Sequence, residues 1–152
     1  MPLKKIDRPD APEDLPAAST QARRFSTARS AQSNALLEDY AELIADLIAT
    51  SGEARPVDIA ARLGVSHVTV AKSVARLKRE GLVTAKPYRG VFLTQTGEAL
   101  AARARMRHRL VVDLLLAVGV PIEAAEADAE GIEHFVSDAT IDAFARFLKA
   151  RT

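Results

Sequence analysis

Apolar residues recur every three or four positions over residues 34–50, and this spacing is typical of an amphipathic helix. The positions concerned are Leu36, Leu37, Tyr40, Leu43, Ile44, Leu47 and Ile48. After a break at Ser51-Gly52, Pro56 suits the first turn of a short helix that ends at Leu63. Within this short helix, Ile59 and Leu63 fall on one face. We therefore expect two helices joined by a turn.

A further helical pattern follows a tight turn at Gly64-Val65-Ser66. Ser66 is a suitable N-cap, and the third helix is expected to run from there to about Glu80. Two short β-prone runs, residues 82–84 and 91–93, flank residues 85–90 and predict a hairpin with a basic tip. The order helix, helix, turn, helix, β-hairpin is that of a winged helix-turn-helix.

The second half of the chain is predicted to be helical throughout, with helices over residues 94–118, 121–135 and 137–149. The last of them carries an apolar stripe made of Ile141, Phe144, Phe147 and Leu148. The expected fold class is therefore mainly α. A winged helix-turn-helix with a small β-hairpin wing occupies residues 34–95, and an all-helical domain occupies residues 96–152.

Residues 1–33 show no periodic apolar pattern and contain four prolines but no glycine. Such a segment cannot bury enough apolar surface to fold alone, so we interpret it as a flexible N-terminal arm. Two sharper roles stay open for its basic residues Arg23, Arg24 and Arg29. They could add electrostatic affinity for DNA, or they could pack on a partner subunit.

The composition narrows the chemistry that the chain can use. Its 152 residues include no Cys, which excludes disulfides, thiolate metal sites and thiol nucleophiles. Any metal must be held by oxygen and imidazole nitrogen atoms. No apolar run approaches the roughly 18 residues that span a bilayer, so we expect a cytoplasmic protein without a membrane partner.

The net charge of +1 conceals strong local charges. Residues 66–93, which include the third helix and the hairpin, carry six basic residues and one acidic residue. Residues 34–65 carry two basic and six acidic residues, and residues 121–134 carry five acidic residues and no Lys or Arg. A basic block that coincides with a winged helix-turn-helix favours DNA binding. An acidic block of this density favours a bound cation.

The start of the third helix is the place where a helix-turn-helix contacts bases in the major groove. The predicted contact residues there are Ser66, His67, Val68, Thr69, Lys72 and Ser73. Val68 and Thr69 suit thymine methyl groups, whereas His67 and Lys72 suit guanine acceptors. Arg76, Lys86 and Arg89 are expected to contact phosphates.

Residues with metal-ligand chemistry stand at helical spacing in two places. Asp39 and Glu42 are three positions apart on the first helix. Glu130, Glu133 and His134 lie on one side of a later helix, because they are separated by three and four positions. His108 stands within the long helix between them, next to Arg107 and Arg109.

These motifs resemble the manganese transport regulator (MntR) branch of the diphtheria-toxin-repressor (DtxR) family. The resemblance rests on Glu38-Asp39-Tyr40-Ala41-Glu42, Arg107-His108, the winged helix between them, and Asp128-Ala129-Glu130-Gly131-Ile132-Glu133-His134, and it covers residues 34–150. It implies a homodimeric repressor of metal-transport genes that is activated by Mn²⁺ and binds a double-stranded operator, expected to be palindromic.

The resemblance also implies a binuclear Mn²⁺ site in each subunit. The implied ligands are Asp39, Glu42, His108, Glu130, Glu133 and His134. Carboxylate and imidazole donors suit Mn²⁺, although Fe²⁺, Co²⁺ or Zn²⁺ can bind such a site in vitro. The final helices are implied to form the dimer interface, which fits the stripe Ile141, Phe144, Phe147 and Leu148.

Two alternatives to a manganese-responsive repressor remain. One is an iron-responsive repressor of the same family; such members carry Met and Cys at two ligand positions, where this chain has Asp39 and Glu130. The other is a metal-independent winged-helix regulator in which the acidic residues form a solvated face. A dimetal hydrolase has no support, because no nucleophile, base or pocket for an organic substrate can be named beside the ligands. We therefore expect no enzyme activity.

Overall fold

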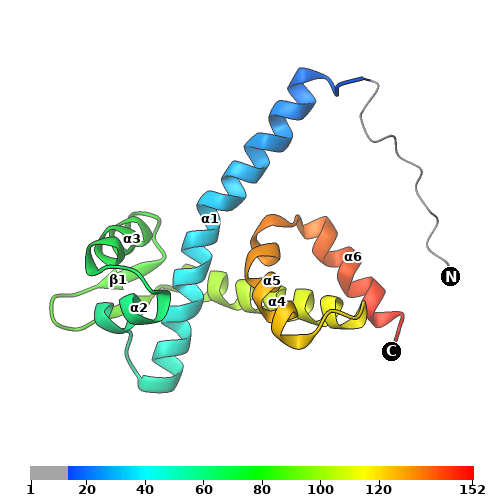
Figure 1. Cartoon of the computed structure of the whole chain (residues 1–152). Helices are drawn as coiled ribbons and strands as arrows, with labels where there is room; N and C mark the ends of the chain where they lie inside the picture. The colour runs from blue at the N-terminus through cyan, green and yellow to red at the C-terminus, as the bar shows by residue number, and fades with distance from the viewer. Residues whose placement is uncertain (1–13) are drawn as a thin grey trace.

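The computed structural model describes residues 14–152 and contains six helices and a two-stranded antiparallel sheet in that range (Figure 1). The elements are α1 (Ala18–Ser51), α2 (Pro56–Leu63), α3 (His67–Arg79), β1 (Val83–Ala85), β2 (Val91–Leu93), α4 (Gln95–Ala117), α5 (Ile122–Phe135) and α6 (Asp138–Lys149). The first 13 residues of the predicted arm lie outside the described part of the chain. The mainly helical fold class and the winged helix-turn-helix are confirmed.

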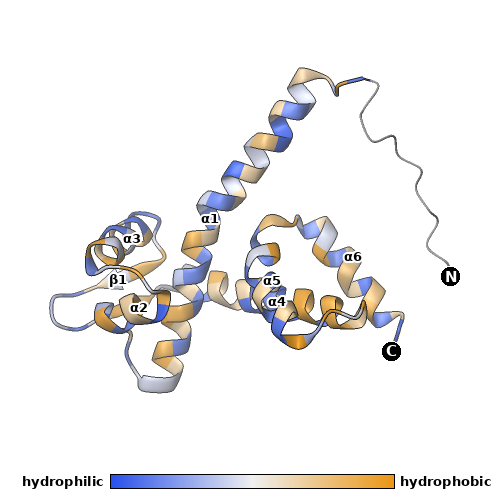
Figure 2. Ribbon diagram, in the orientation of Figure 1, coloured by the Kyte–Doolittle hydropathy of each residue, from blue (hydrophilic) through white to orange (hydrophobic). Residues whose placement is uncertain are grey.

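The fold has two parts that share the helices α1 and α4 (Figure 1). In the first, α2, α3 and the hairpin surround the second half of α1 over a core that includes Ile44, Ile59 and Leu77. In the second, α5 and α6 pack on α4 around Val111 and Ala129. Figure 2 shows hydrophobic stretches on α2, in the first part, and on α4 and α5, in the second. Because α1 contacts both α4 and α5, it connects the two parts.

The wing is joined closely to the start of α4. Strand β1 pairs with β2 in the register Val83↔Leu93, and the backbone of Ala54 adds a bridge to β2 at Val91. At the N-terminus of α4, a Cβ atom on Gly97 would lie 2.1 Å from the carbonyl oxygen of Leu82. Only glycine permits this approach, so the wing packs directly against the start of α4.

Helix α1 begins 16 residues earlier than the sequence pattern predicts. The expectation of a flexible arm is corrected for residues 18–33, which form the first half of α1 and project from the rest of the fold (Figure 1). The prediction relied on an apolar stripe, and an exposed helix has no core to face. Its Ala, Gln and Arg residues nevertheless have high helix propensity. The described helices include none that is long and apolar enough to cross a membrane.

Candidate metal centre

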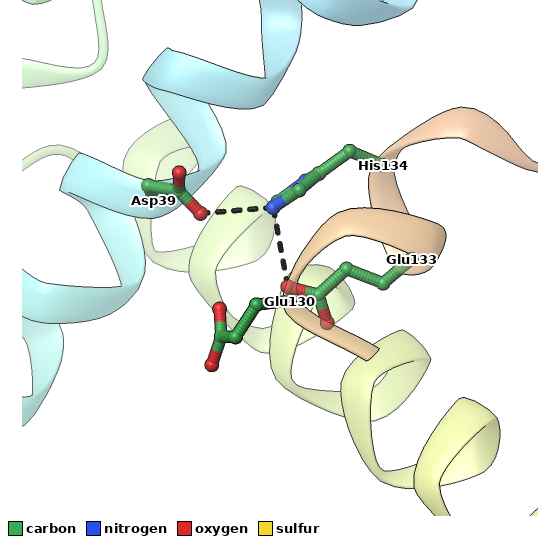
Figure 3. Close-up of side chains that lie close together, drawn as sticks. All are labelled: Asp39, Glu130, Glu133 and His134. Carbon is green, nitrogen blue, oxygen red and sulfur yellow. Dashed lines mark ion pairs between the residues drawn. The ribbon is translucent and has the colours of Figure 1, made fainter. Parts of the chain in front are cut away.

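Four of the six predicted ligands meet where α1 lies against α5 (Figure 3). Asp39 projects from α1, and Glu130, Glu133 and His134 project from α5. One ligand atom from each of these residues lies within 4.8 Å of the corresponding atoms of the other three. A divalent cation with metal–oxygen distances of about 2.0–2.6 Å can bridge such separations.

His134 lies at the centre of this group. Its Nε2 atom is 2.8 Å from Oδ1 of Asp39 and 3.2 Å from Oε1 of Glu133, as the dashed lines in Figure 3 mark. The side chains of His134 and Glu133 are almost fully buried, whereas those of Asp39 and Glu130 are half-exposed or more. The group is therefore anchored on its inner side and open to solvent on its outer side, which gives an ion a path of entry.

The other two predicted ligands, His108 and Glu42, stand beside the group. Nδ1 of His108, on α4, lies 3.1 Å from Oε2 of Glu133 and 3.6 Å from Oε1 of Glu130. Burial, and then the negative charge of Glu130, raise the pKa of Glu42, on α1. The structure thus brings all six predicted residues to one region, supplied by three helices.

Several buried polar atoms at this place have no hydrogen-bond partner. In the described part of the chain, five buried side-chain atoms are without one: Nδ1 of His108, both carboxylate oxygens of Glu133, Nε2 of His134 and the hydroxyl of Tyr40. Buried polar atoms are nearly always satisfied in native proteins. Four of these five atoms belong to predicted ligands and lie in the same region, so the residues fit a bound cation.

Burial and neighbouring charges shift the pKa values of two predicted ligands, His134 and Glu133. Burial lowers the pKa of His134, but the carboxylates of Asp39 and Glu38 outweigh it and raise that pKa to about 10. Burial raises the pKa of Glu133 to about 7, against the opposing effect of His134 and His108. Protons therefore reside on groups that must lose them to bind a metal, and a divalent cation would take their place.

Two carboxylates that the sequence analysis did not assign hold the histidines in place. Oε2 of Glu38 hydrogen-bonds to Nδ1 of His134, and Oε2 of Glu126 lies 2.9 Å from Nε2 of His108. The second ring nitrogen of each histidine, Nε2 of His134 and Nδ1 of His108, then faces the ligand group. Such partners fix the tautomer and the orientation of a metal-binding histidine. Glu38 is 96 positions from His134 in the sequence, so no local spacing reveals the pair.

We expect Glu38→Ala to weaken Mn²⁺ binding by about 10- to 100-fold, because His134 loses the acceptor that orients its ring. Glu38→Gln is the matched control, since its amide oxygen can still accept the Nδ1 proton, and its loss should be clearly smaller. Calorimetric titration of Mn²⁺ into both variants measures the difference. Equal affinities for the alanine variant and the unaltered chain would contradict the role given to Glu38.

Arg107 is buried below the ligand group and holds the end of α5. Its Nε donates to the carbonyl oxygen of Glu133 at 3.0 Å, and its other nitrogens donate to the carbonyl oxygen of Val136 and to Oδ1 of Asp138. Arg103 also binds Asp138, and first Arg103 and then Arg107 lower the pKa of that carboxyl group. The guanidinium group of Arg107 thus donates hydrogen bonds to carbonyl oxygens at the C-terminus of α5, beside the predicted ligands Glu133 and His134.

Most predicted DNA-contact residues lie on the outer surface of α3 and the wing. His67, Val68, Thr69 and Lys72 on α3, and Lys86 and Arg89 on the wing, are exposed. Tyr88, which the sequence analysis left unassigned, stands fully exposed between Lys86 and Arg89 with φ of 65°. An aromatic side chain held out from a strained basic tip is a further candidate for DNA contact.

Three residues of the predicted DNA surface have other contacts. Ser73 is buried on the inner face of α3, which corrects its assignment to the groove-facing surface. Ser66 accepts a hydrogen bond from the backbone N–H of Thr69 at 3.1 Å, so its hydroxyl caps α3 as expected. Arg76 donates to the hydroxyl of Ser33 on α1 at 2.8 Å and is half-buried.

The apolar stripe on α6 is divided between two roles. Ile141 is 6 % exposed and Phe144 packs beside it in the core of α4, α5 and α6, which corrects the assignment of Ile141 to a dimer interface. Phe147 is 42 % exposed, and Leu148 is partly exposed. The sequence pattern marks which residues are apolar on one side of a helix, but a wide stripe can face a core with one edge and solvent with the other.

Two family models match the chain. One describes the N-terminal DNA binding domain of an iron dependent repressor and matches residues 34–91. The other describes the metal binding and dimerisation domain of an iron dependent repressor and matches residues 94–152. Together they cover the winged helix-turn-helix and the helices that supply the candidate metal site.

Curated relatives and solved structures agree with these models. The chain is 54 % identical over 123 residues to the transcriptional regulator MntR of Escherichia coli O157:H7, which covers 81 % of this chain and 79 % of that protein. It is 40 % identical over 106 residues to the HTH-type transcriptional regulator MntR of Bacillus subtilis (strain 168). This match covers 70 % of this chain and 75 % of that protein. The structure of the manganese regulator SloR superposes with a TM-score of 0.67 and 31 % identity, covering 74 % of this chain and 53 % of that longer one.

Proposed function

The chain belongs to the iron-dependent repressor family of DNA-binding, metal-binding transcriptional regulators, and from this premise we propose that it is a manganese-responsive repressor of metal-transport genes. Its ligands are Asp39, Glu42, His108, Glu130, Glu133 and His134. The winged helix-turn-helix of residues 34–95 binds DNA, and residues 96–152 bind metal and form a homodimer. The protein is a regulator and not an enzyme.

The observation that carries this proposal is the group of buried nitrogen and oxygen atoms that lie between α1, α4 and α5 without hydrogen-bond partners. All of its candidate donors are carboxylate oxygens and imidazole nitrogens, and none is sulfur. Carboxylates suit Mn²⁺ among the divalent ions, whereas sulfur ligands favour softer metals. Two similar solved structures are those of a manganese regulator and of a manganese-dependent transcriptional repressor in complex with manganese, which supports the same metal here.

The position of Glu133 supports a binuclear site. Its Oε1 faces Nε2 of His134 at 3.2 Å, and its Oε2 faces Nδ1 of His108 at 3.1 Å. A carboxylate with one oxygen toward each of two imidazoles suits a bridge between two cations. Asp39 lies on the His134 side, and Glu130 approaches His108 at 3.6 Å. If two cations bind, Asp39 and His134 would hold one, Glu130 and His108 would hold the other, and Glu133 would contribute one oxygen to each.

The location of the site explains how metal could control DNA binding. A bound cation supplies the positive charge that keeps the carboxylates of α1 and α5 together. Asp39 and Glu42 belong to the helix around which the DNA-binding part is built, and Glu130, Glu133 and His134 belong to the metal-binding part. Holding these side chains together fixes the angle between the two parts.

In a homodimer, that angle sets the distance between the two α3 helices. Two-fold symmetry requires matching half-sites, so we expect a palindromic operator with centres roughly 34 Å apart. A shift of such an equilibrium from 1:99 to 99:1 requires about 5.5 kcal/mol of differential binding, which two divalent ions can supply.

Calorimetric titration of divalent metals into the full chain tests this proposal. We expect two Mn²⁺ ions to bind per chain, well below the millimolar range. A failure to bind Mn²⁺ in that range would instead indicate the metal-independent winged-helix regulator. Comparing Mn²⁺ with Fe²⁺ under anaerobic conditions as activators of DNA binding decides between the manganese-responsive and iron-responsive alternatives, since stronger activation by Fe²⁺ would overturn the manganese assignment.

A further inference from the structure

The projecting first half of α1, residues 18–33, supplies no residue to the candidate metal site. It extends beyond the rest of the fold as a single helix, and its residues are exposed apart from Thr20, Gln21 and Ala31, which are half-exposed (Figure 1). In proteins most helical stability comes from packing, and this exposed segment gains little from packing on the rest of the described chain. Its surface is therefore free to bind a partner.

All charged residues of this segment are basic. Residues 15–37 contain Arg23, Arg24 and Arg29 and no acidic residue. None of the three arginines forms an ion pair with a described residue, and the only side-chain contact among them joins Arg23 to Thr20 at 3.5 Å. Three unpaired guanidinium groups on an otherwise neutral helix favour an anionic partner.

One face of the segment collects its hydrogen-bond donors. Ser19, Arg23, Ser26, Ser30 and Ser33 follow one another at intervals of four, three, four and three residues. At about 100° per residue, this spacing places them on one side of the helix, with Arg29 beside them and Arg24 on the opposite side. Serine hydroxyls and arginine guanidinium groups are the side chains that contact phosphates.

This Ser/Arg face is continuous with the surface of α3. At its lower end the hydroxyl of Ser33 accepts a hydrogen bond from Arg76, which α3 contributes to the predicted phosphate contacts. The same side of α1, one turn further on, carries the buried residues Leu37 and Tyr40 that pack in the DNA-binding part. The face therefore points to the side of the molecule on which α3 lies.

We propose that the Ser/Arg face of α1 binds the phosphate backbone of the DNA beside the stretch that α3 occupies. This inference rests on the proposed function in one respect, namely that α3 lies in the major groove. Arg23 and Arg29 neutralise phosphates, and the serine hydroxyls donate to phosphate oxygens. Ala22 is the apolar residue within this face, and Phe25, which is 60 % exposed, lies on its flank beyond Arg29, so the face lacks the contiguous apolar core that an interface with a second protein chain needs.

The salt dependence of DNA binding tests this inference. The probe is a fluorescent duplex selected by the full chain with Mn²⁺ from a random-sequence library, and the affinity is measured by anisotropy at a series of salt concentrations. Each phosphate contact contributes about −0.9 to the slope of log K against log salt, and R23Q/R29Q removes two contacts from each subunit of the homodimer, so it should reduce the magnitude of the slope by about 3.6. R24Q is the control, because it removes one arginine charge from the opposite side of the same helix, and its slope should stay close to that of the unaltered chain.

Each possible result decides the matter. An unchanged slope in R23Q/R29Q, or an equal decrease in R24Q, would overturn the inference. So would dissociation of R23Q/R29Q into monomers in sedimentation, since the face would then belong to an interface between two copies. If the unaltered chain binds the duplex equally well with and without Mn²⁺, the proposed function fails, while the difference between the two variants still decides this inference. Circular dichroism checks that both variants keep α1.

Discussion

Replacing Asp39 with alanine is expected to abolish the dependence of DNA binding on Mn²⁺ while the chain stays folded. Asp39 is the ligand through which α1 reaches the buried pair Glu133 and His134, because its Oδ1 lies 2.8 Å from Nε2 of His134. Without it, the DNA-binding part and the metal-binding part lose a shared ligand. We expect Mn²⁺ affinity to fall by more than about 100-fold, since even a residue that only orients a ligand costs 10- to 100-fold.

The folded state should tolerate this change, because the side chain of Asp39 is 44 % exposed. The buried His134 keeps its hydrogen bond to Glu38, so the loss of Asp39 does not leave its ring without a charged partner. Asp128→Ala is the matched control, because it removes an exposed carboxylate from α5 two positions from Glu130 but outside the ligand group. Anisotropy titrations of Mn²⁺ in the presence of duplex DNA compare the two variants. Retained Mn²⁺ dependence in Asp39→Ala would remove Asp39 from the site.

Arg107→Ala is expected to lower the free energy of unfolding by about 2–5 kcal/mol, because each buried acceptor left without a donor costs about 1–3 kcal/mol. Truncation leaves the carbonyl oxygens of Glu133 and Val136 without their donor at a place where the side chain of Arg107 is 9 % exposed. The end of α5 would then no longer be held, and Mn²⁺ binding should weaken as a consequence.

Arg103→Ala provides the comparison, because Arg103 binds the same carboxylate, Asp138, from a position that is 55 % exposed. An exposed ion pair contributes about 1 kcal/mol or less, so this variant should stay close to the unaltered chain. Urea denaturation followed by circular dichroism, at one fixed protein concentration, measures both. A cost for Arg107→Ala no greater than that for Arg103→Ala would show that the buried contacts do not stabilise the fold.

Local patterns were sufficient for most of the fold. The break at Gly52, Pro56 at the start of α2 and the Ser66 cap of α3 each act within one helical turn, so α2 and α3 were predicted to within a residue or two. Helix α1 was predicted too short, because the criterion was an apolar stripe and residues 18–33 have none. An exposed helix that binds something other than its own core cannot be found by that criterion.

The candidate ligands could be predicted as residue types, but their surroundings could not. Glu130, Glu133 and His134 stand at helical spacing, and the structure brings them to Asp39 across 91 or more positions of chain. The partners that orient the histidines, Glu38 and Glu126, depend on how α1, α4 and α5 pack. The inward positions of Ser73 and Ile141 have the same origin, since the tilt of a helix decides which edge of its face is buried.

The central claim is that a divalent cation held between α1, α4 and α5 enables the chain to bind DNA. The most direct measurement is the affinity of the full chain for the selected duplex at constant ionic strength, first with a chelator and then with saturating Mn²⁺. The account predicts an increase of at least about 100-fold, within the roughly 10⁴-fold that a complete shift between two states requires. Equal affinity in the two conditions would contradict it.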